Sequence, residues 1–171
     1  RSPETLSTVL GKATEFLISY AKAFKEAGAS GVIVAEPVAG LLSPNQCDEY
    51  SSRWVKAIVD AVQDETFLVV LHNCGPTVPL VPSMVSTGAG AFHFGNAVAM
   101  TEILPQVPAD RLACGNINPS GTFRIGTPEK MEEGGVASSV VLLAVRSRNR
   151  NAEAFTKAMD QMWSCTCGPT V

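Results

Sequence analysis

The chain has 171 residues, 46% hydrophobic and 17% charged, with 13 basic against 16 acidic side chains and a net charge of −3. This composition excludes a disordered chain, and the lack of a basic surplus excludes nucleic acid as the main partner. No apolar run approaches the roughly 20 residues that cross a bilayer, and no apolar segment follows Arg1-Ser2-Pro3-Glu4 as in a signal peptide, so we expect a cytoplasmic protein without membrane contact.

Helical and strand patterns alternate along the chain. Helices start at N-cap and proline pairs such as Ser2-Pro3 and Ser43-Pro44, and continue with apolar residues at helical spacing. Short continuous apolar runs between them are typical of strands buried on both faces. In chain order, these patterns predict helix 3–27, strand 31–35, helix 44–62, strand 66–71, helix 81–86, strand 89–95, helix 97–104, strand 111–117, a helix from Thr127, strand 138–145 and helix 151–163.

This alternation predicts an α/β fold of parallel β/α repeats, because right-handed crossovers join successive strands in the same direction. Two architectures fit the order of elements: part of a (β/α)₈ TIM barrel and an open, doubly wound sheet. The 171 residues are too few for a complete barrel, which takes about 250. We expect a single domain over residues 1–171.

Polar side chains with chemical capability follow the predicted strands where each one ends. Glu36 follows the first strand, His72 and Cys74 the second, His93 the third, and Asn116 and Asn118 the fourth. Active sites of parallel α/β folds lie at this edge of the sheet. The distribution therefore predicts an enzyme, with these residues as the candidate site.

The sequence His72-Asn73-Cys74 suggests a metal site. Residues i and i+2 of an extended segment point the same way, so an imidazole and a thiolate could reach one cation, and zinc accepts this mixture of ligands. The alternative is a hydrogen-bonded histidine beside an inert thiol. A zinc site needs at least one more ligand. Candidates are Cys114, Cys165, Cys167, Glu36 and His93.

The other candidate residues have structural alternatives of their own. Glu36 could be a metal ligand or an acid with a raised pKa, or it could cap nearby backbone N–H groups. Asn116 and Asn118 could bind a substrate carboxylate or amide, or could simply form a turn. Cys47 lies on the apolar side of its predicted helix and is expected in the core. The chain has five cysteines and no secretory signal, so a disulfide framework is not expected.

Four blocks of sequence resemble one known family. They are the segment Ala35-Glu36-Pro37 to Ser43-Pro44, the segment His72-Asn73-Cys74-Gly75, the segment from Gly88 to His93, and Gly115 to Pro119 followed by Gly126 to Glu129. In this order and spacing they resemble the uroporphyrinogen decarboxylase superfamily, over roughly residues 5 to 131. The resemblance implies a TIM barrel, of which this chain is the C-terminal portion.

The resemblance implies two kinds of chemistry. One branch of the superfamily decarboxylates uroporphyrinogen, a tetrapyrrole, without a cofactor. The other contains methylcobamide:coenzyme M methyltransferases, in which a His-x-Cys motif and a later cysteine bind a zinc ion that activates the acceptor thiol. His72 and Cys74 match that motif. We therefore expect zinc, held by His72, Cys74 and Cys167, with a methylated corrinoid or corrinoid protein as donor and a small thiol as acceptor.

In the methyltransferase reading, Glu36 and His93 are the expected catalytic residues, and Asn116 and Asn118 bind substrate. Decarboxylation remains the alternative activity. A third possibility is a truncated, non-catalytic piece of a barrel, because the chain is about half the family's length and the resemblance fades after Met131, which makes residues 132–171 a divergent tail. An incomplete barrel would expose strand edges, so we expect a homo-oligomer.

Overall fold

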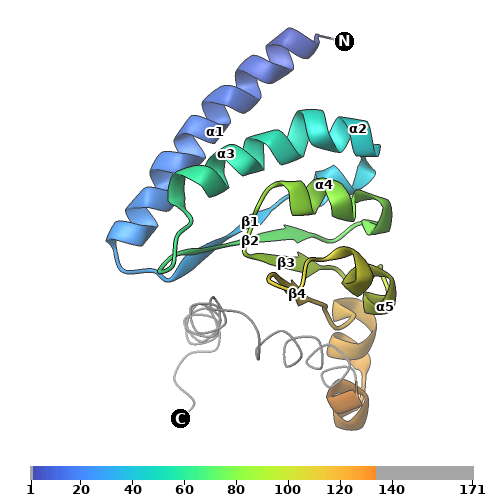
Figure 1. The fold of residues 1–171 in the computed structure, drawn as a ribbon. Coiled ribbons are helices and arrows are strands. Elements are labelled where there is room, and N and C mark those ends of the chain that lie inside the picture. Colours follow the sequence, from blue (N-terminus) through green and yellow to red (C-terminus); the bar gives the residue numbers. More distant parts are fainter. Residues whose placement is uncertain (1, 134–171) are drawn as a thin grey trace.

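The computed structural model describes residues 2–133 as one parallel sheet with helices (Figure 1). The sheet has the order β1-β2-β3-β4, and every neighbouring pair is parallel. This arrangement confirms the predicted α/β class and is consistent with part of a barrel. The predicted strand 138–145, helix 151–163 and nearly all of the tail 132–171 lie outside the described residues. The strands are β1 (Gly31–Ala35), β2 (Leu68–Asn73), β3 (Ala91–Phe94) and β4 (Leu112–Cys114).

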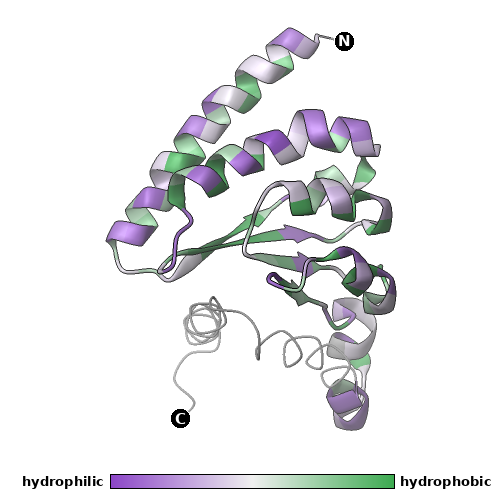
Figure 2. Cartoon of the chain, in the orientation of Figure 1, coloured by the Kyte–Doolittle hydropathy of each residue, from purple (hydrophilic) through white to green (hydrophobic). Residues whose placement is uncertain are grey.

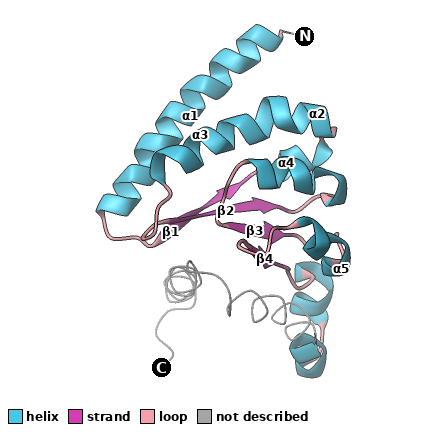
Figure 3. Cartoon of the chain, viewed as in Figure 1, coloured by secondary structure: helices cyan, strands magenta, loops and turns pink. Residues whose placement is uncertain are grey.

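The helices alternate with the strands, and α3 and α4 lie over one face of the sheet (Figures 1 and 3). Helix α1 packs on the outside of α3 and also contacts β1. Within the described residues, no helix combines the length and apolar character needed to cross a membrane. The helices are α1 (Pro3–Glu26), α2 (Pro44–Cys47), α3 (Arg53–Val62), α4 (Val81–Ser86) and α5 (Met100–Ile103).

The two faces of the sheet carry different apolar clusters, since side chains alternate along each strand. Residues such as Leu71 and Phe92 join the main core with the buried faces of α3 and α4. The opposite face carries a smaller buried cluster: Leu68, Val70, Ala91, Leu112 and Cys114. Apolar residues on both faces explain why the strands are hydrophobic along most of their length in Figure 2, with hydrophilic colour at the C-terminal ends of β2 and β3.

The predicted helix 44–62 is confirmed as helical throughout, but its middle is a π-turn instead of an α-helix. A capping box at Ser43 starts α2 as predicted, but a π-turn at Asp48–Ser52 separates α2 from α3. The extra residue of a π-turn shifts the helical register. Here Ser51 and Ser52 become buried.

Two further elements are shorter than predicted. The predicted helix 97–104 is only α5 followed by a 3₁₀ turn at Leu104–Gln106, because proline at position 105 has no N–H to continue an α-helix. The predicted strand 111–117 ends at Cys114, ahead of a π-turn at Pro119–Phe123 that Asn118 caps.

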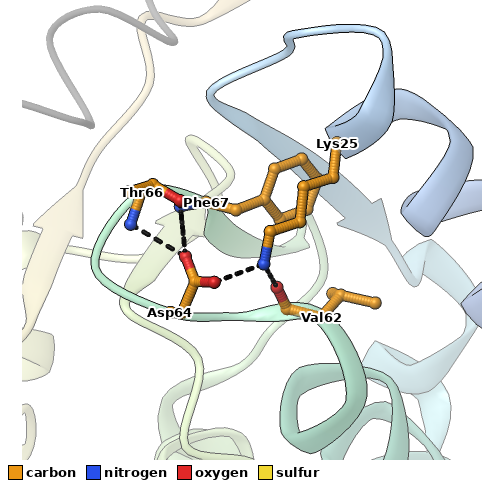
Figure 4. Close-up of polar contacts among 5 residues, drawn as sticks. All are labelled: Lys25, Val62, Asp64, Thr66 and Phe67. Carbon is orange, nitrogen blue, oxygen red and sulfur yellow. Dashed lines mark hydrogen bonds and ion pairs between the residues drawn. The ribbon is translucent and has the colours of Figure 1, made fainter.

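The C-terminal end of α1 is fixed to the loop that leads into β2 (Figure 4). Lys25 donates a hydrogen bond to the carbonyl oxygen of Val62 at 3.0 Å and forms an ion pair with Asp64. The other carboxylate oxygen of Asp64 accepts hydrogen bonds from the backbone N–H groups of Thr66 (2.8 Å) and Phe67 (3.0 Å). The pKa of Asp64 is held well below its usual range, first by Lys25 and then by the hydrogen bonds from the backbone and side chain of Thr66.

Candidate functional site

The strand register places candidate residues in one row across the sheet. Ala35 of β1 pairs with His72 of β2, His72 with His93 of β3, and His93 with Cys114 of β4. Paired residues of parallel strands share a face, so the two histidines and Cys114 lie on the face that carries the smaller apolar cluster. The row stands at the C-terminal edge of the strands, where the sequence predicted a site.

The two histidine rings lie side by side. Their centroids are 4.7 Å apart, and Nδ1 of His72 is 3.1 Å from the carbonyl oxygen of His93. A hydrogen bond from Nδ1 fixes the tautomer of His72 and leaves its Nε2 as an electron-pair donor. Burial lowers the pKa of His93, and the neighbouring His72 lowers it further. A backbone hydrogen bond with Gly115 raises this pKa and offsets part of the change. The lowered pKa favours the neutral ring of His93, which can donate an electron pair.

Cys74 follows β2 and is exposed, in a turn that glycines allow to pack tightly. A side chain on Gly95 would meet the Cα of Cys74 at 2.6 Å, and one on Gly40 would meet the Cα of Gly75 at 2.9 Å. Asn73 accepts a hydrogen bond from the N–H of Gly75 at 3.0 Å and is itself buried. The loops after β1, β2 and β3 thus converge around the His-x-Cys segment. Asn73 and these glycines were missed as site-forming residues, because a single sequence does not reveal which loops meet.

Glu36 extends β1 toward the same edge. Its backbone N–H donates to the carbonyl oxygen of His72 at 2.9 Å, and its carboxylate accepts a hydrogen bond of 2.5 Å from the Ser51 hydroxyl. Burial raises the pKa of Glu36, and the bond from Ser51 partly offsets that rise. The raised pKa agrees with one of the three predicted possibilities for this residue. Ser51 itself gave no sequence signal, because its inward position depends on the π-turn.

The two asparagines lie beyond β4, and both are exposed. The side-chain oxygen of Asn118 accepts hydrogen bonds from the N–H groups of Ser120 (3.0 Å) and Gly121 (2.9 Å). That oxygen stabilises the turn, as the structural alternative anticipated. Substrate binding by Asn116 and Asn118 stays a prediction.

The donor set for zinc is incomplete within residues 2–133. No group of three or more His, Cys, Asp or Glu side chains in this part of the chain is arranged to hold a metal ion. His72 and Cys74 supply an imidazole and a thiol of the kinds that zinc prefers. The predicted third ligand, Cys167, and the other late candidate, Cys165, lie outside the described residues. Cys47 is buried as predicted, and burial raises the pKa of Cys114 to about 12.

Comparison with known proteins gives a single family with two activities. Residues 1–140 match the family described as uroporphyrinogen decarboxylase (URO-D). A methylcobamide:CoM methyltransferase of Methanosarcina mazei is 30% identical over 131 residues, which are 75% of this chain and 38% of that protein. The methyltransferase of Methanosarcina acetivorans is 29% identical over 132 residues, 76% of this chain and 39% of that protein.

A uroporphyrinogen decarboxylase of a Synechococcus species is also 29% identical, over 136 residues that make up 77% of this chain and 37% of that protein. The chain therefore spans about two fifths of the length of these curated relatives. Identities this similar do not separate the two activities, so the choice between them depends on the residues of the site.

Proposed function

Because the chain belongs to the uroporphyrinogen decarboxylase family, we propose that it serves zinc-dependent transfer of a methyl group from a methylated corrinoid to a small thiol. One observation carries this proposal. The His72-Asn73-Cys74 segment lies at the C-terminal edge of the strands. The Nδ1 of His72 forms a hydrogen bond with the carbonyl oxygen of His93, so Nε2 remains available to bind a metal ion. Hydrogen bonds of this kind commonly orient histidine ligands of zinc.

Each candidate residue has a role in this proposal. His72 and Cys74 hold the zinc ion together with Cys167. When bound, zinc lowers the pKa of a coordinated thiol, so that a thiolate nucleophile is present at neutral pH. Glu36 stays protonated to a higher pH than an exposed glutamate, so it can hold or release a proton beside the acceptor thiol. His93 fixes His72 through its backbone carbonyl, and Asn116 and Asn118 contact the substrate.

Zinc analysis of the purified 171-residue chain tests the metal site. We expect one zinc ion per chain after dialysis against a zinc buffer, and loss of that ion in His72→Ala and Cys74→Ala. Cobalt substitution gives a second measurement, because a thiolate ligand adds a charge-transfer band in the near ultraviolet that Cys74→Ala removes. Cys114→Ala, which removes a buried thiol from the same face of the sheet, is the matched control. Unchanged zinc content in His72→Ala contradicts the proposal.

Methyl transfer is measured separately, with methylcobalamin as donor and coenzyme M as acceptor. Demethylation of the corrinoid changes its visible absorbance, and we expect that change to require bound zinc. If the chain binds zinc but leaves methylcobalamin unchanged, the result supports the proposed metal site and contradicts the proposed methyl transfer.

Decarboxylation of a porphyrinogen is the second candidate. Uroporphyrinogen decarboxylases match about the same share of the chain at nearly the same identity as the methyltransferases. This activity needs no metal at His72 and Cys74. Turnover of uroporphyrinogen that is unaffected by a chelator and by Cys74→Ala would favour it over methyl transfer.

A further inference from the structure

Asn73, the last residue of β2, carries a buried amide on an apolar face of the sheet. Side chains alternate along a strand, so Asn73 shares its face with Val69 and Leu71, which belong to the main core. Only 2% of Asn73 is exposed. Asparagine is disfavoured in strands, and a buried amide costs free energy unless it is hydrogen-bonded. The place of Asn73 in β2 therefore depends on the bond that its side chain makes.

That bond closes the turn around Cys74. The side-chain oxygen Oδ1 of Asn73 accepts a hydrogen bond from the N–H of Gly75, two residues further on, at 3.0 Å. The backbone carbonyl oxygen of Asn73 accepts a second bond, from the N–H of Gly95 in the loop after β3, also at 3.0 Å. Cys74 itself is exposed, but the residues on both sides of it are held by hydrogen bonds.

The loop after β1 lies against the same turn. Gly40 belongs to the 3₁₀ turn Pro37–Leu41, and a Cβ on Gly40 would come within 2.9 Å of Oδ1 of Asn73 and within 2.9 Å of the Cα of Gly75. Real Cβ atoms do not approach other atoms this closely, so only glycine allows the two loops to touch here. The loops after β1, β2 and β3 therefore meet at Asn73.

We propose that Asn73 is a positioning residue, which fixes the turn that carries the Cys74 thiol before a metal ion binds. The inference rests on the proposed zinc site. Asn73 faces the opposite side of the sheet from His72, so it acts through the turn and not as a ligand.

The geometry of a two-residue chelate explains why a fixed turn matters. In a fully extended strand, residues i and i+2 are about 6.6 Å apart. A nitrogen and a sulfur bound to one tetrahedral zinc ion are only about 3.5 Å apart. A loose turn at Cys74 would have to be ordered in the converging arrangement when the metal binds, and that ordering weakens the affinity. A turn that is already ordered avoids this loss.

Nitrogen relaxation measured by NMR on the full 171-residue chain tests the positioning without a metal. We expect an order parameter S² of about 0.85 at the Cys74 amide in the wild type and below about 0.6 in Asn73→Leu. Leucine keeps the branched shape of the side chain and removes the acceptor. A disordered Cys74 in the wild type, or an unchanged S² in Asn73→Leu, overturns the proposal.

The matched control is Thr87→Val. The buried hydroxyl oxygen of Thr87 accepts the N–H of Ala89, also two residues further on, at 3.3 Å and at the opposite edge of the sheet. Valine keeps the shape of threonine and removes this bond, so Cys74 should stay ordered. A loss of order at Cys74 in Thr87→Val equal to that in Asn73→Leu would be a general effect of destabilisation and overturns the proposal.

Two further variants separate the hydrogen bond from the fold. In Asn73→Ser the hydroxyl can still accept the N–H of Gly75, so most of the order at Cys74 should be retained; a loss as large as in Asn73→Leu overturns the proposal. Circular dichroism verifies folding. If Asn73→Leu does not fold, Gly40→Ala replaces it, because the added Cβ displaces the turn while Asn73 is kept. An unchanged S² at Cys74 in Gly40→Ala then overturns the proposal.

Metal affinity is measured separately, by titration with cobalt in competition with a chelator. We expect Asn73→Leu to weaken cobalt binding about tenfold or more, the size of effect typical of residues that orient metal ligands, and Thr87→Val to leave it unchanged. If the wild type binds no cobalt, the proposed zinc-dependent function is contradicted, and the order parameters still decide whether Asn73 fixes Cys74. If Asn73→Leu loosens Cys74 but binds cobalt as tightly as the wild type, the role in metal binding is overturned.

Discussion

The cysteines show how residues of one type acquire different chemistry from their positions. Cys74 is exposed in the turn after β2, whereas Cys114 is buried in β4 with its pKa raised to about 12. Only the thiolate is nucleophilic, so the raised pKa keeps Cys114 in its unreactive thiol form near neutral pH. We predict that iodoacetamide modifies Cys74 within minutes and leaves Cys114 unmodified in the folded protein. Peptide mapping by mass spectrometry measures both sites.

Unfolding in denaturant provides the control for this labelling, because both cysteines should then react at similar rates. If Cys114 were modified as fast as Cys74 in the folded chain, β4 would have to open readily, and the description of its buried face would be wrong.

The buried carboxyl of Glu36 makes the stability of the folded chain depend on pH. Because burial raises its pKa in the folded state, the favourable contribution of the protonated form is complete below the unfolded pKa and is lost as the pH rises through the folded pKa. Glu36→Gln keeps the shape but cannot ionise. We predict that this substitution stabilises the protein more at pH 7 than at pH 4.

Urea unfolding at the two pH values measures the difference, with the exposed Glu26→Gln as control. Equal effects of Glu36→Gln at both pH values would show that the carboxyl is not perturbed by folding.

At the scale of elements, Gln63 connects two strands at the edge of the sheet opposite the candidate site. Its side-chain oxygen accepts hydrogen bonds from the N–H groups of Val69 (3.1 Å) and Gly90 (2.8 Å), and its nitrogen donates to the carbonyl oxygen of Gly88 at 3.0 Å. Gln63→Ala leaves these partly buried backbone groups without a partner. We predict a loss of about 1–3 kcal/mol in the free energy of unfolding.

Gln106→Ala is the matched control, since the side chain of Gln106 makes one exposed hydrogen bond, to the carbonyl oxygen of Glu102. Thermal or urea unfolding should show a change below about 0.5 kcal/mol for this variant. A similar small change in Gln63→Ala would mean that water replaces its three bonds.

The elements also show which structural features the sequence makes predictable. The strands were predictable because continuous apolar runs bounded by glycine or proline leave few alternatives to a buried parallel strand. The π-turn within helix 44–62 was not predictable, and neither was the hydrogen bond that Ser51 of this turn donates to Glu36 of another element. The candidate site shows the same division between predictable and unpredictable features. His72, His93 and Glu36 were predictable as site residues because each lies at the end of a predicted strand or directly after it. Their pairing across the sheet required the strand register, which depends on packing against the helices.

For the whole molecule, the sheet explains how a chain of this length brings the candidate histidines together. The relative from Methanosarcina mazei is about twice as long, and the described residues form a four-stranded sheet with β1 and β4 at its edges. The row containing His72 and His93 crosses the middle of this sheet, so its geometry depends on β2 and β3 and not on an edge strand. The position of the proposed metal ligand His72 therefore does not depend on an edge strand.

Zinc binding should consequently stabilise the whole folded chain. A ligand that binds only the folded state at 100 times its Kd adds about 2.7 kcal/mol to the free energy of unfolding. For a domain of this size, we predict a rise in Tm of about 5 °C or more on addition of zinc. The rise should shrink as the pH falls, because protons compete with zinc for the imidazole of His72 and the thiol of Cys74. Calorimetry at fixed protein concentration measures the shift in Tm. We expect Cys74→Ser to abolish the shift. Cys47→Ser, at a buried position away from the site, should preserve it. An equal rise in Cys74→Ser would place the bound metal elsewhere on the chain.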